Sequence, residues 1–207
     1  MTEKETEEKI LDAATDIFLK RGMDGAKMQE IADRAGINKA LLHYYYRSKE
    51  KLFLTVFRKV FPRILPGTLQ VFQTNLDFFE KLKGFIDGYI TILSTYRELP
   101  LFIIGELTRN PDIIVQSLTD TLNSMDFDIM GTIEEDLRRE KEAGHIIDID
   151  ARQLMVNVIS LCIFPFAGRP VIKLIAFEND EEAYDVFLSR RREEVYSFVV
   201  NSIRKPT

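Results

Sequence analysis

The chain has 207 residues, of which 45% are hydrophobic, enough for one helical domain of ordinary size or two small ones. Its formal net charge of −5 argues against a general nucleic-acid coat protein, and its single cysteine, Cys162, excludes an intrachain disulfide. The charged N-terminus predicts no signal peptide, and no apolar run reaches the ~20 residues that cross a bilayer, so we expect a cytoplasmic protein with no membrane partner.

The N-terminal segment predicts an amphipathic helix from about Glu5 to Arg21. Glutamates near its start suit the positive end of the helix dipole, and Gly22 is expected to end the helix. The apolar side chains that recur at helical spacing on its inner face are Ile10, Ala14, Ile17 and Phe18.

Residues 28–53 predict two short helices joined by a sharp turn, which is the pattern of a helix-turn-helix that can enter DNA. Glycine takes the positive φ of such a turn at little steric cost, and Asn38 is a good N-cap for the second helix. The residues expected to hold the two helices together are Ile31, Ala32, Gly36, Leu42 and Tyr46. The residues expected on the exposed face of the second helix, within reach of phosphates and base edges, are Lys39, Ala40, His43 and Tyr44.

The charge is distributed unevenly along the chain. Residues 27–59 hold eight Lys or Arg against three Asp or Glu, whereas residues 60–207 hold sixteen against twenty-three. An acidic protein with one basic face suits docking on a defined DNA site better than coating DNA. A solvated helical surface is the alternative explanation, so the charge supports the helix-turn-helix interpretation without proving it.

Residues 8–57 resemble the start of the tetracycline-repressor (TetR) family of bacterial regulators. The resemblance rests on IA at 31–32, AG at 35–36, the aromatic run HYYY at 43–46 and RSKE at 47–50, which agree with the family pattern in register. Lys27 stands where the family usually has a Thr or Ser that caps a helix, and Asn38 replaces the usual Ser. The residues that the resemblance places on a double-stranded DNA operator are Lys27, Asn38, Lys39, Ala40, His43, Tyr44, Tyr45 and Lys49.

Ser48 is expected to cap a further helix that carries Lys49 and Lys51 in its first turn. Backbone N–H groups and lysines at a helix start suit a phosphate. This helix meets Pro62 and Pro66, so we place the domain junction near residues 58–66. We therefore expect a DNA-binding domain over residues 1–58 and an effector-binding and dimerisation domain over residues 59–207.

The rest of the chain predicts further helices and no sheet. The expected helices cover residues 76–98, 101–109, 111 to about 144, 151 to about 164, and 181 to about 204, with Asp150 and Asp180 as N-caps of the last two. Cys162 lies in an apolar stretch and is expected to be a buried small hydrophobe rather than a redox sensor. The predicted fold is all-α, with an N-terminal three-helix helix-turn-helix domain and a C-terminal helical ligand-binding and dimerisation bundle.

A single recognition helix contacts few base pairs, whereas two copies related by a two-fold axis would read half-sites about 34–36 Å apart. In TetR-like proteins the last two helices of each subunit form a four-helix interface, which implies a homodimer here. The apolar residues expected at that interface are Leu154, Val158, Leu161, Val195, Phe198, Val199 and Ile203. Burial in the core of one subunit is the alternative for each of them.

TetR-like proteins typically use the C-terminal part as a pocket whose ligand moves the DNA-reading heads out of register with the operator. The resemblance therefore implies a small-molecule effector and a ligand-responsive transcriptional regulator, a repressor rather than an activator. Candidate walls for a largely apolar ligand are Phe85, Tyr89, Tyr96, Phe102 and Phe164, and Glu106 could meet a cationic ligand. Aromatic residues at helical spacing more often fill a core.

Two other classes of function compete with a regulator. An all-α enzyme would need a nucleophile, a base or a set of metal ligands. Of the two histidines, only His145 lies outside the recognition helix, and it has Asp148 and Asp150 near it in the sequence. No phosphate-loop or dinucleotide-binding motif occurs. We therefore expect no enzyme, no metal and no cofactor. A helical protein-protein interaction module without sequence-specific DNA binding is the second alternative, and it predicts no salt-dependent duplex binding.

Overall fold

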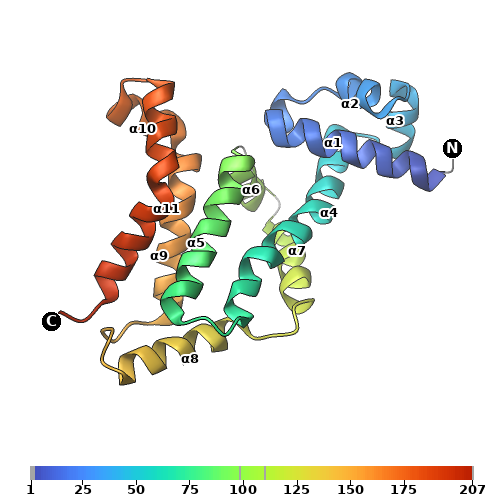
Figure 1. Ribbon diagram of the computed structural model, residues 1–207. Helices are drawn as coiled ribbons and strands as arrows, with labels where there is room; N and C mark the ends of the chain where they lie inside the picture. The colour runs from blue at the N-terminus through green and yellow to red at the C-terminus, as the bar shows by residue number, and fades with distance from the viewer. Residues whose placement is uncertain (1–2, 98, 110, 207) are drawn as a thin grey trace. The chain divides into compact units, whose positions relative to one another are not determined.

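The computed structural model describes residues 3–97, 99–109 and 111–206, and the fold is all-α as predicted (Figure 1). Among these residues the sole strand-like feature is an isolated antiparallel bridge between Ile146 and Arg204. The helices in chain order are α1 Glu3–Gly25, α2 Met28–Ala35, α3 Lys39–Tyr45, α4 Lys49–Leu69, the short 3-10 helix η1 Gln70–Gln73, α5 Phe78–Thr95, α6 Leu99–Arg109, α7 Pro111–Asn123, α8 Ile129–Glu142, α9 Ala151–Ala167, α10 Arg169–Phe177 and α11 Glu181–Ile203.

The packing of the helices divides the chain into two compact units. Unit 1 comprises residues 1–64 and 96–122, and unit 2 comprises residues 65–95 and 123–207. The division falls inside α4, and it groups α6 and nearly all of α7 with the N-terminal helices. The expectation that residues 1–58 form a separate DNA-binding domain stays a prediction.

Unit 1 has its own apolar core among α1 to α4. Phe18 of α1 meets Phe53 of α4 edge to face, with ring centroids 4.6 Å apart. Ile114 of α7 is fully buried in the same core. Other members of this core are Ile10, Ala14, Ile17, Ile31, Ala32, Leu42, Leu52 and Val56. Because Leu42 belongs to it, the core holds α3 from beneath and leaves its opposite face to solvent.

Unit 2 is built around three helices, α5, α9 and α11, which pack against one another in pairs and lie side by side in Figure 1. α8 packs on α5 and α9, and α10 packs on α9 and α11. The core between them includes Phe85, Ile90, Val158, Cys162 and Val195, each at most 2% exposed. The prediction that Cys162 is a buried small hydrophobe is confirmed.

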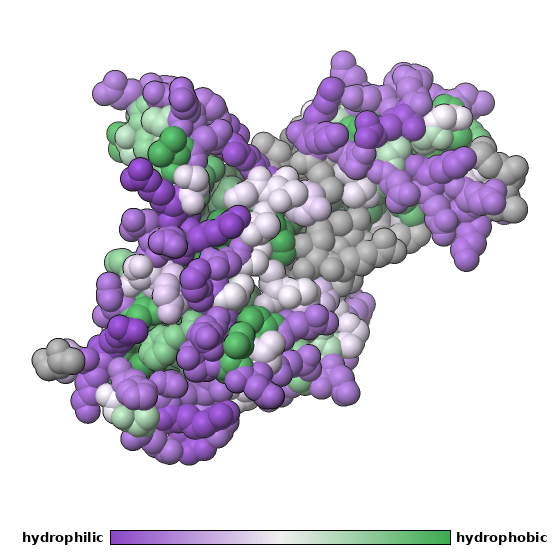
Figure 2. Space-filling view, in the orientation of Figure 1, coloured by the Kyte–Doolittle hydropathy of each residue, from purple (hydrophilic) through white to green (hydrophobic). Residues whose placement is uncertain are grey.

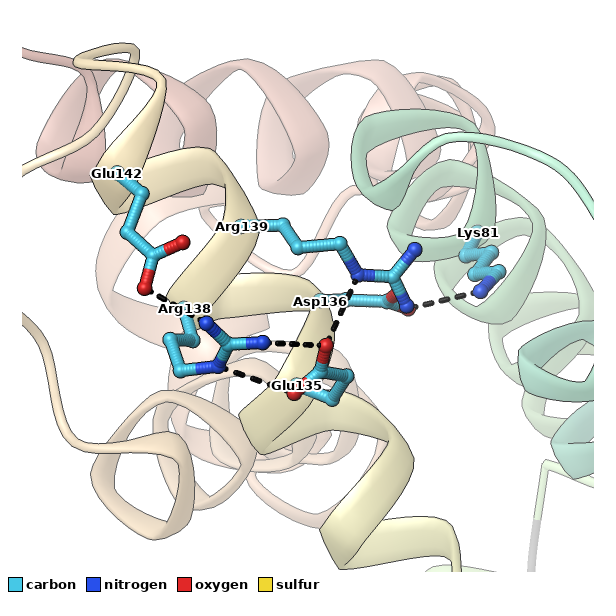
Figure 3. A network of polar contacts seen from close by, with 6 residues as sticks. All are labelled: Lys81, Glu135, Asp136, Arg138, Arg139 and Glu142. Atoms are coloured by element: carbon cyan, nitrogen blue, oxygen red, sulfur yellow. Dashed lines mark hydrogen bonds and ion pairs between the residues drawn. The ribbon is translucent and has the colours of Figure 1, made fainter.

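One ion pair lies inside unit 2 and joins α5 to α8 (Figure 3). Lys81 Nζ and Asp136 Oδ2 are 2.8 Å apart, and the two side chains are only 7% and 6% exposed. Arg139 Nη2 donates to the other carboxylate oxygen of Asp136 over 3.1 Å, so this buried carboxylate has a charged donor on each oxygen. Figure 3 also shows Arg138 of α8 reaching carboxylates of its own helix, away from the buried pair.

One predicted helix end is wrong, and another helix runs through the prolines at which we placed the domain junction. α1 continues through Gly22 to Gly25, and α4 continues through Pro62 and Pro66 to Leu69. A proline inside a helix removes one backbone hydrogen bond and costs about 3 kcal/mol. Phe18 of α1 and Phe57 and Leu69 of α4 are buried, and burial of such apolar residues elsewhere in each helix offsets the cost of a single glycine or proline.

The helix expected from Pro111 to about Gly144 is in fact two helices. α7 ends at Asn123, and α8 begins after Asp128, whose carboxylate accepts a hydrogen bond from Gly131 N at 3.0 Å. Gly144 follows α8 with a φ of +78°. A capping aspartate therefore starts a new helix where apolar periodicity alone suggested a continuous one.

Asp150 and Asp180 cap α9 and α11 as predicted, since each carboxylate accepts a backbone N–H three residues further along. α9 runs on past the expected end to Ala167, and α10 was not predicted. No single helix in the described ranges is long and apolar enough to span a membrane. α9 and α10 would meet that criterion only as a pair, and the pair bends by 78° at the break between them.

Candidate nucleic-acid interface

The turn between α2 and α3 is a Schellman motif centred on Gly36. Gly36 has φ +69° and ψ +31°, and its N–H donates to the carbonyl of Asp33 at 3.1 Å. The N–H of Ile37 donates to the carbonyl of Ala32 at 3.0 Å. These two bonds satisfy the last carbonyls of α2, and the left-handed conformation that they need is one that glycine adopts without a Cβ penalty.

Asn38 starts α3 immediately after that turn. Its side-chain Oδ1 accepts a hydrogen bond from Leu41 N at 2.8 Å, which is the N-cap that the sequence predicted. Leu42 is fully buried beneath the helix. On the other side of α3, Lys39, Ala40, His43 and Tyr44 are exposed. The N-cap at Asn38 and the burial of Leu42 together fix the orientation of this exposed face.

The end of α3 is tied to α1 by a buried tyrosine. Tyr46 is 8% exposed, and its hydroxyl donates to Glu7 Oε1 at 3.1 Å. Burial, and after it the negative charge of Glu7, raises the pKa of Tyr46 far above its usual range. The neighbouring Tyr45 hydroxyl donates to the backbone oxygen of Glu3 at 3.4 Å. α1 therefore supports the tyrosine end of α3.

Lys49 opens α4 in a half-buried position. Its Nζ donates to the backbone oxygen of Ala26, the residue before Lys27, at 3.2 Å, so it joins the start of α4 to the approach to α2. Ser48 Oγ accepts from Lys51 N at 3.2 Å and caps the helix. The pKa of Glu50 is lowered, chiefly because its carboxylate accepts a hydrogen bond from its own backbone N–H at this helix start. Lys27, the N-cap of α2, makes no side-chain capping bond.

A hollow of about 380 Å³ opens on the surface of unit 1 beside the end of α3. We call it the α3–α4 hollow, and its lining residues are Tyr44, Tyr45, Tyr46, Arg47, Lys51, Leu54, Thr55 and Arg58. Three of them are cations and none is acidic. Sequence reasoning offered Lys51 to a phosphate as one of the lysines at this helix start, but it did not select Arg47 or Arg58, although the seven-residue spacing of Lys51 and Arg58 on one helix was a usable signal.

The eight predicted DNA-contacting residues all belong to unit 1, and none of them is fully buried. Those that are exposed are Lys27, Asn38, Lys39, Ala40, His43 and Tyr44, and those that are half-buried are Tyr45 and Lys49. Figure 2 shows hydrophilic colouring over much of this part of the chain. The contacts of these residues with DNA stay predictions.

The residues predicted for the dimer interface divide into two groups. Five of them are at most 2% exposed within unit 2 itself: Leu154, Val158, Val195, Val199 and Ile203. These five have almost no surface to offer a partner, so the structure corrects the expectation and assigns them to the subunit core. Leu161 is half-buried, and Phe198 is 65% exposed.

Other apolar residues of α9, α10 and α11 are exposed, and none of them was predicted at the dimer interface. They are Val156, Phe164, Val171, Leu174, Ile175 and Val186. Figure 2 shows part of this set as a green area over α10. Large apolar side chains gathered on neighbouring helices are typical of a surface that another protein covers.

Those predicted pocket residues whose side chains are described do not form one cluster within a unit. Phe85 and Tyr89 stack in unit 2, with centroids 5.6 Å apart and ring planes inclined by 15°. Phe164 is 63% exposed, which corrects its expected place in a pocket wall. Tyr96 belongs to unit 1, and the side chains of Phe102 and Glu106 lie outside the described ones. The effector pocket stays a prediction.

His145, the histidine outside α3, lies within hydrogen-bond distance of a carboxylate. Its Nδ1 lies 2.8 Å from Glu140 Oε2. Of the two aspartates that sequence reasoning placed near it, Asp148 pairs with Lys141 at 2.7 Å and Asp150 caps α9. These residues therefore make separate local contacts.

Comparison with known proteins gives three similarities that cover the helix-turn-helix and the whole fold. Residues 10–56 match the family model for bacterial regulatory proteins of the tetR family. The HTH-type transcriptional activator FasR of Mycolicibacterium smegmatis is 32% identical over 84 residues, which are 41% of this chain and 38% of that protein. The HTH-type transcriptional regulator RutR of Escherichia coli (strain K12) is 23% identical over 195 residues, 94% of this chain and 89% of that protein.

A solved structure shares the complete fold. It is described as a transcriptional regulator from Saccharomonospora viridis in complex with choline, and it superposes with a TM-score of 0.72 at 20% identity. The superposition covers 99% of this chain and 100% of that chain. At this level of identity the likeness concerns the fold.

Proposed function

The chain belongs to the tetR family of bacterial regulatory proteins and is a helix-turn-helix transcriptional regulator, and from this premise we propose that it binds a palindromic operator as a homodimer. The observation that carries the proposal is the geometry of α3. Asn38 caps this helix, Leu42 anchors it in the core, and its opposite face is exposed. A helix held in this way can be inserted into a major groove without a rearrangement of unit 1.

The exposed residues of the helix-turn-helix divide by their chemistry into base-reading and backbone-holding groups. Lys39, Ala40 and His43 would face base edges or the adjoining backbone. The residues that would hold phosphates are Asn38, Tyr44, Tyr45, Lys49 and Lys27. Asn38 can serve twice, because its Oδ1 caps α3 while its amide nitrogen still offers donors. Lys49 donates to the backbone oxygen of Ala26 and so holds its ammonium group at the start of α4.

A homodimer would supply the second recognition helix. The exposed apolar side chains of α9 and α11, among them Val156, Phe164, Val186 and Phe198, support a partner surface on the last long helices. Burying such side chains against a second copy contributes about 25 cal/mol for each Å² of apolar surface removed from water. Two-fold symmetry would then set the spacing of the half-sites.

The finer function that we propose is repression relieved by a small, largely apolar effector bound in the helical part, in a protein that works in the cytoplasm without enzymatic activity. The aromatic interior of unit 2, with Phe85 stacked on Tyr89, supports an apolar ligand. By linkage, an effector that weakens DNA binding must bind the DNA-bound form less tightly, typically by about 1–3 kcal/mol.

The deciding experiment is selection of bound duplexes from a random DNA pool by the purified full chain, at two salt concentrations. The proposal expects an enriched palindrome and binding that weakens steeply as salt rises. Lys39→Ala should weaken binding to the selected palindrome, whereas Lys205→Ala, which removes an exposed charge from unit 2, should not. Failure to enrich any duplex at low salt would favour the protein-interaction module instead.

A further inference from the structure

The α3–α4 hollow is a cationic surface without a carboxylate to neutralise it. Arg47, Lys51 and Arg58 are all exposed, and none of them forms an ion pair with any residue in the described part of the chain. The hollow of about 590 Å³ in unit 2 is different, because Glu134, Asp148 and Asp150 line it together with Arg138 and Lys141. Of these two surfaces, only the α3–α4 hollow has the charge to bind an anion.

The wall of the hollow nearest α3 is made of tyrosines. Tyr44 is 75% exposed, and its ring meets that of Tyr45 edge to face with centroids 5.6 Å apart. A tyrosine ring left this open to water is a surface suited to contact with a sugar or base, and its hydroxyl can donate to a phosphate. Tyr44 and Tyr45 also belong to the predicted DNA-contacting set, so the hollow is continuous with the recognition helix.

The cations continue from α3 along α4. Lys51 and Arg58 are seven residues apart, which places them on one face of α4 and about 10.5 Å apart along its axis. Phosphates follow each DNA strand at about 3.4 Å per step along the duplex axis. Two cations at this separation can therefore contact two different phosphates of one strand. Thr55 lies between them, and its hydroxyl is already donated to the carbonyl of Lys51 at 2.9 Å.

We propose that the α3–α4 hollow binds the DNA backbone that flanks each half-site, with Arg47, Lys51 and Arg58 contacting phosphates outside the base pairs read by α3. The inference rests on the proposed function and deepens it, because it extends the DNA contacted by the helix-turn-helix of each subunit beyond the palindrome. It adds affinity without adding sequence information, since phosphates are the same in every sequence.

The test combines protein variants with two duplexes that share the selected palindrome. One duplex is cut at the outer edges of the palindrome, and the other is extended by about ten base pairs, roughly one helical turn, on each side. Each phosphate contact changes the affinity as about the 0.9 power of salt concentration, so the loss of one contact at 0.1 M salt lowers affinity about fivefold to tenfold. Arg58→Ala should show this loss on the long duplex and less than a twofold loss on the short one.

Matched variants separate this effect from a general loss of charge. Lys51→Ala should behave as Arg58→Ala does, and Lys20→Ala, an exposed lysine of α1 outside the hollow, should change both duplexes by the same factor. Thermal unfolding of each variant checks that the head stays folded. If Arg58→Ala and Lys51→Ala lower the affinity for the short and the long duplex by the same factor, the flanking contact is overturned, whereas the proposal of operator binding stands. Wild-type protein that binds neither duplex would overturn the proposed function as well.

A free phosphate compound is the other source of the same chemistry. Inorganic phosphate at millimolar concentration, added to the protein without DNA, should leave the thermal unfolding of wild type and Arg58→Ala equally unchanged. Stabilisation of the wild type alone would identify the hollow as a site for a small anion and overturn its assignment to the DNA backbone.

Discussion

Arg191 donates from its Nη2 to the backbone oxygen of Leu161 over 3.0 Å and so joins α11 to α9. In a regular helix this carbonyl would accept a hydrogen bond from the N–H of residue 165, but residue 165 is proline and has no N–H. One turn away, the hydroxyl of Tyr184 donates to the carbonyl of Pro165. Two side chains of α11 thus satisfy backbone groups at the proline site of α9.

The first prediction is that Arg191→Ala destabilises unit 2 because it leaves the Leu161 carbonyl unsatisfied. An unsatisfied buried acceptor costs about 1–3 kcal/mol. In a Pro165→Ala background the N–H of residue 165 can take over, so Arg191→Ala should cost less there. Urea unfolding at fixed protein concentration measures the free energy of unfolding of the two single variants and the double variant, and Arg192→Ala, at an exposed position, is the control. Equal costs in the two backgrounds would show that Arg191 acts through another contact.

The second prediction concerns the unequal roles of Lys81 and Asp136. Asp136→Leu leaves the buried ammonium of Lys81 without a partner and should cost about 3–5 kcal/mol. Lys81→Met should cost clearly less, because Arg139 still donates to Asp136. The surface pair of Lys83 and Asp87 is the control, and Lys83→Ala should change the free energy of unfolding by no more than about 1 kcal/mol. A larger loss for Lys81→Met than for Asp136→Leu would contradict this assignment.

The third prediction is that Gly36→Ala destabilises the helix-turn-helix. A Cβ meets nothing within 4 Å there, so the cost comes from the φ of +69°, and a left-handed conformation costs other residues about 1–2 kcal/mol. Gly67→Ala in α4 is the matched control, since that site is also open but has no positive φ. It should stabilise by up to about 1 kcal/mol, because alanine is the better helix former. Thermal unfolding compares the two, and a neutral Gly36→Ala would refute the role of the turn.

The fourth prediction follows from the burial of Cys162, which raises the pKa of its thiol from 9.0 to about 12. At pH 8 only about one thiol in ten thousand is then ionised, so a thiol reagent should modify the folded protein far more slowly than the urea-unfolded protein. Between pH 9 and 12 the unfolded state binds fewer protons at this site, and stability should fall as pH rises. Cys162→Ala should remove that part of the fall. Rapid modification of the folded protein would contradict the assignment.

Local chemistry was enough to predict the turns and caps that position the recognition helix. Asn38, Asp150 and Asp180 each cap a helix as predicted, because a capping hydrogen bond joins residues three apart and depends on little else. The turn at Gly36 has the predicted positive φ for the same reason. The match of residues 10–56 to the tetR family model bears out the family resemblance on the same local stretch.

The apolar pattern predicted burial but not the surface that provides it. Leu154, Val158 and Val199 lie on apolar stripes of helices expected at a dimer interface, yet their own subunit buries them. An apolar stripe on a helix predicts only that this face is buried, and either a neighbouring helix of the same chain or a second copy of the chain can bury it. Phe164 and Phe198, which face solvent in the single chain, could be distinguished from them only once the helices were packed.

The sequence by itself determined the all-α fold, the helix-turn-helix with its capped recognition helix, and the family, because all of these depend on residues within a few positions of one another. Only the tertiary structure decided that α1 and α4 run through Gly22, Pro62 and Pro66, that Arg191 replaces the hydrogen bond missing at Pro165, and that three tyrosines and three cations line one hollow. These features join residues whose proximity depends on how whole helices pack. The energy of that packing is the sum of many distant contacts, which no local pattern contains.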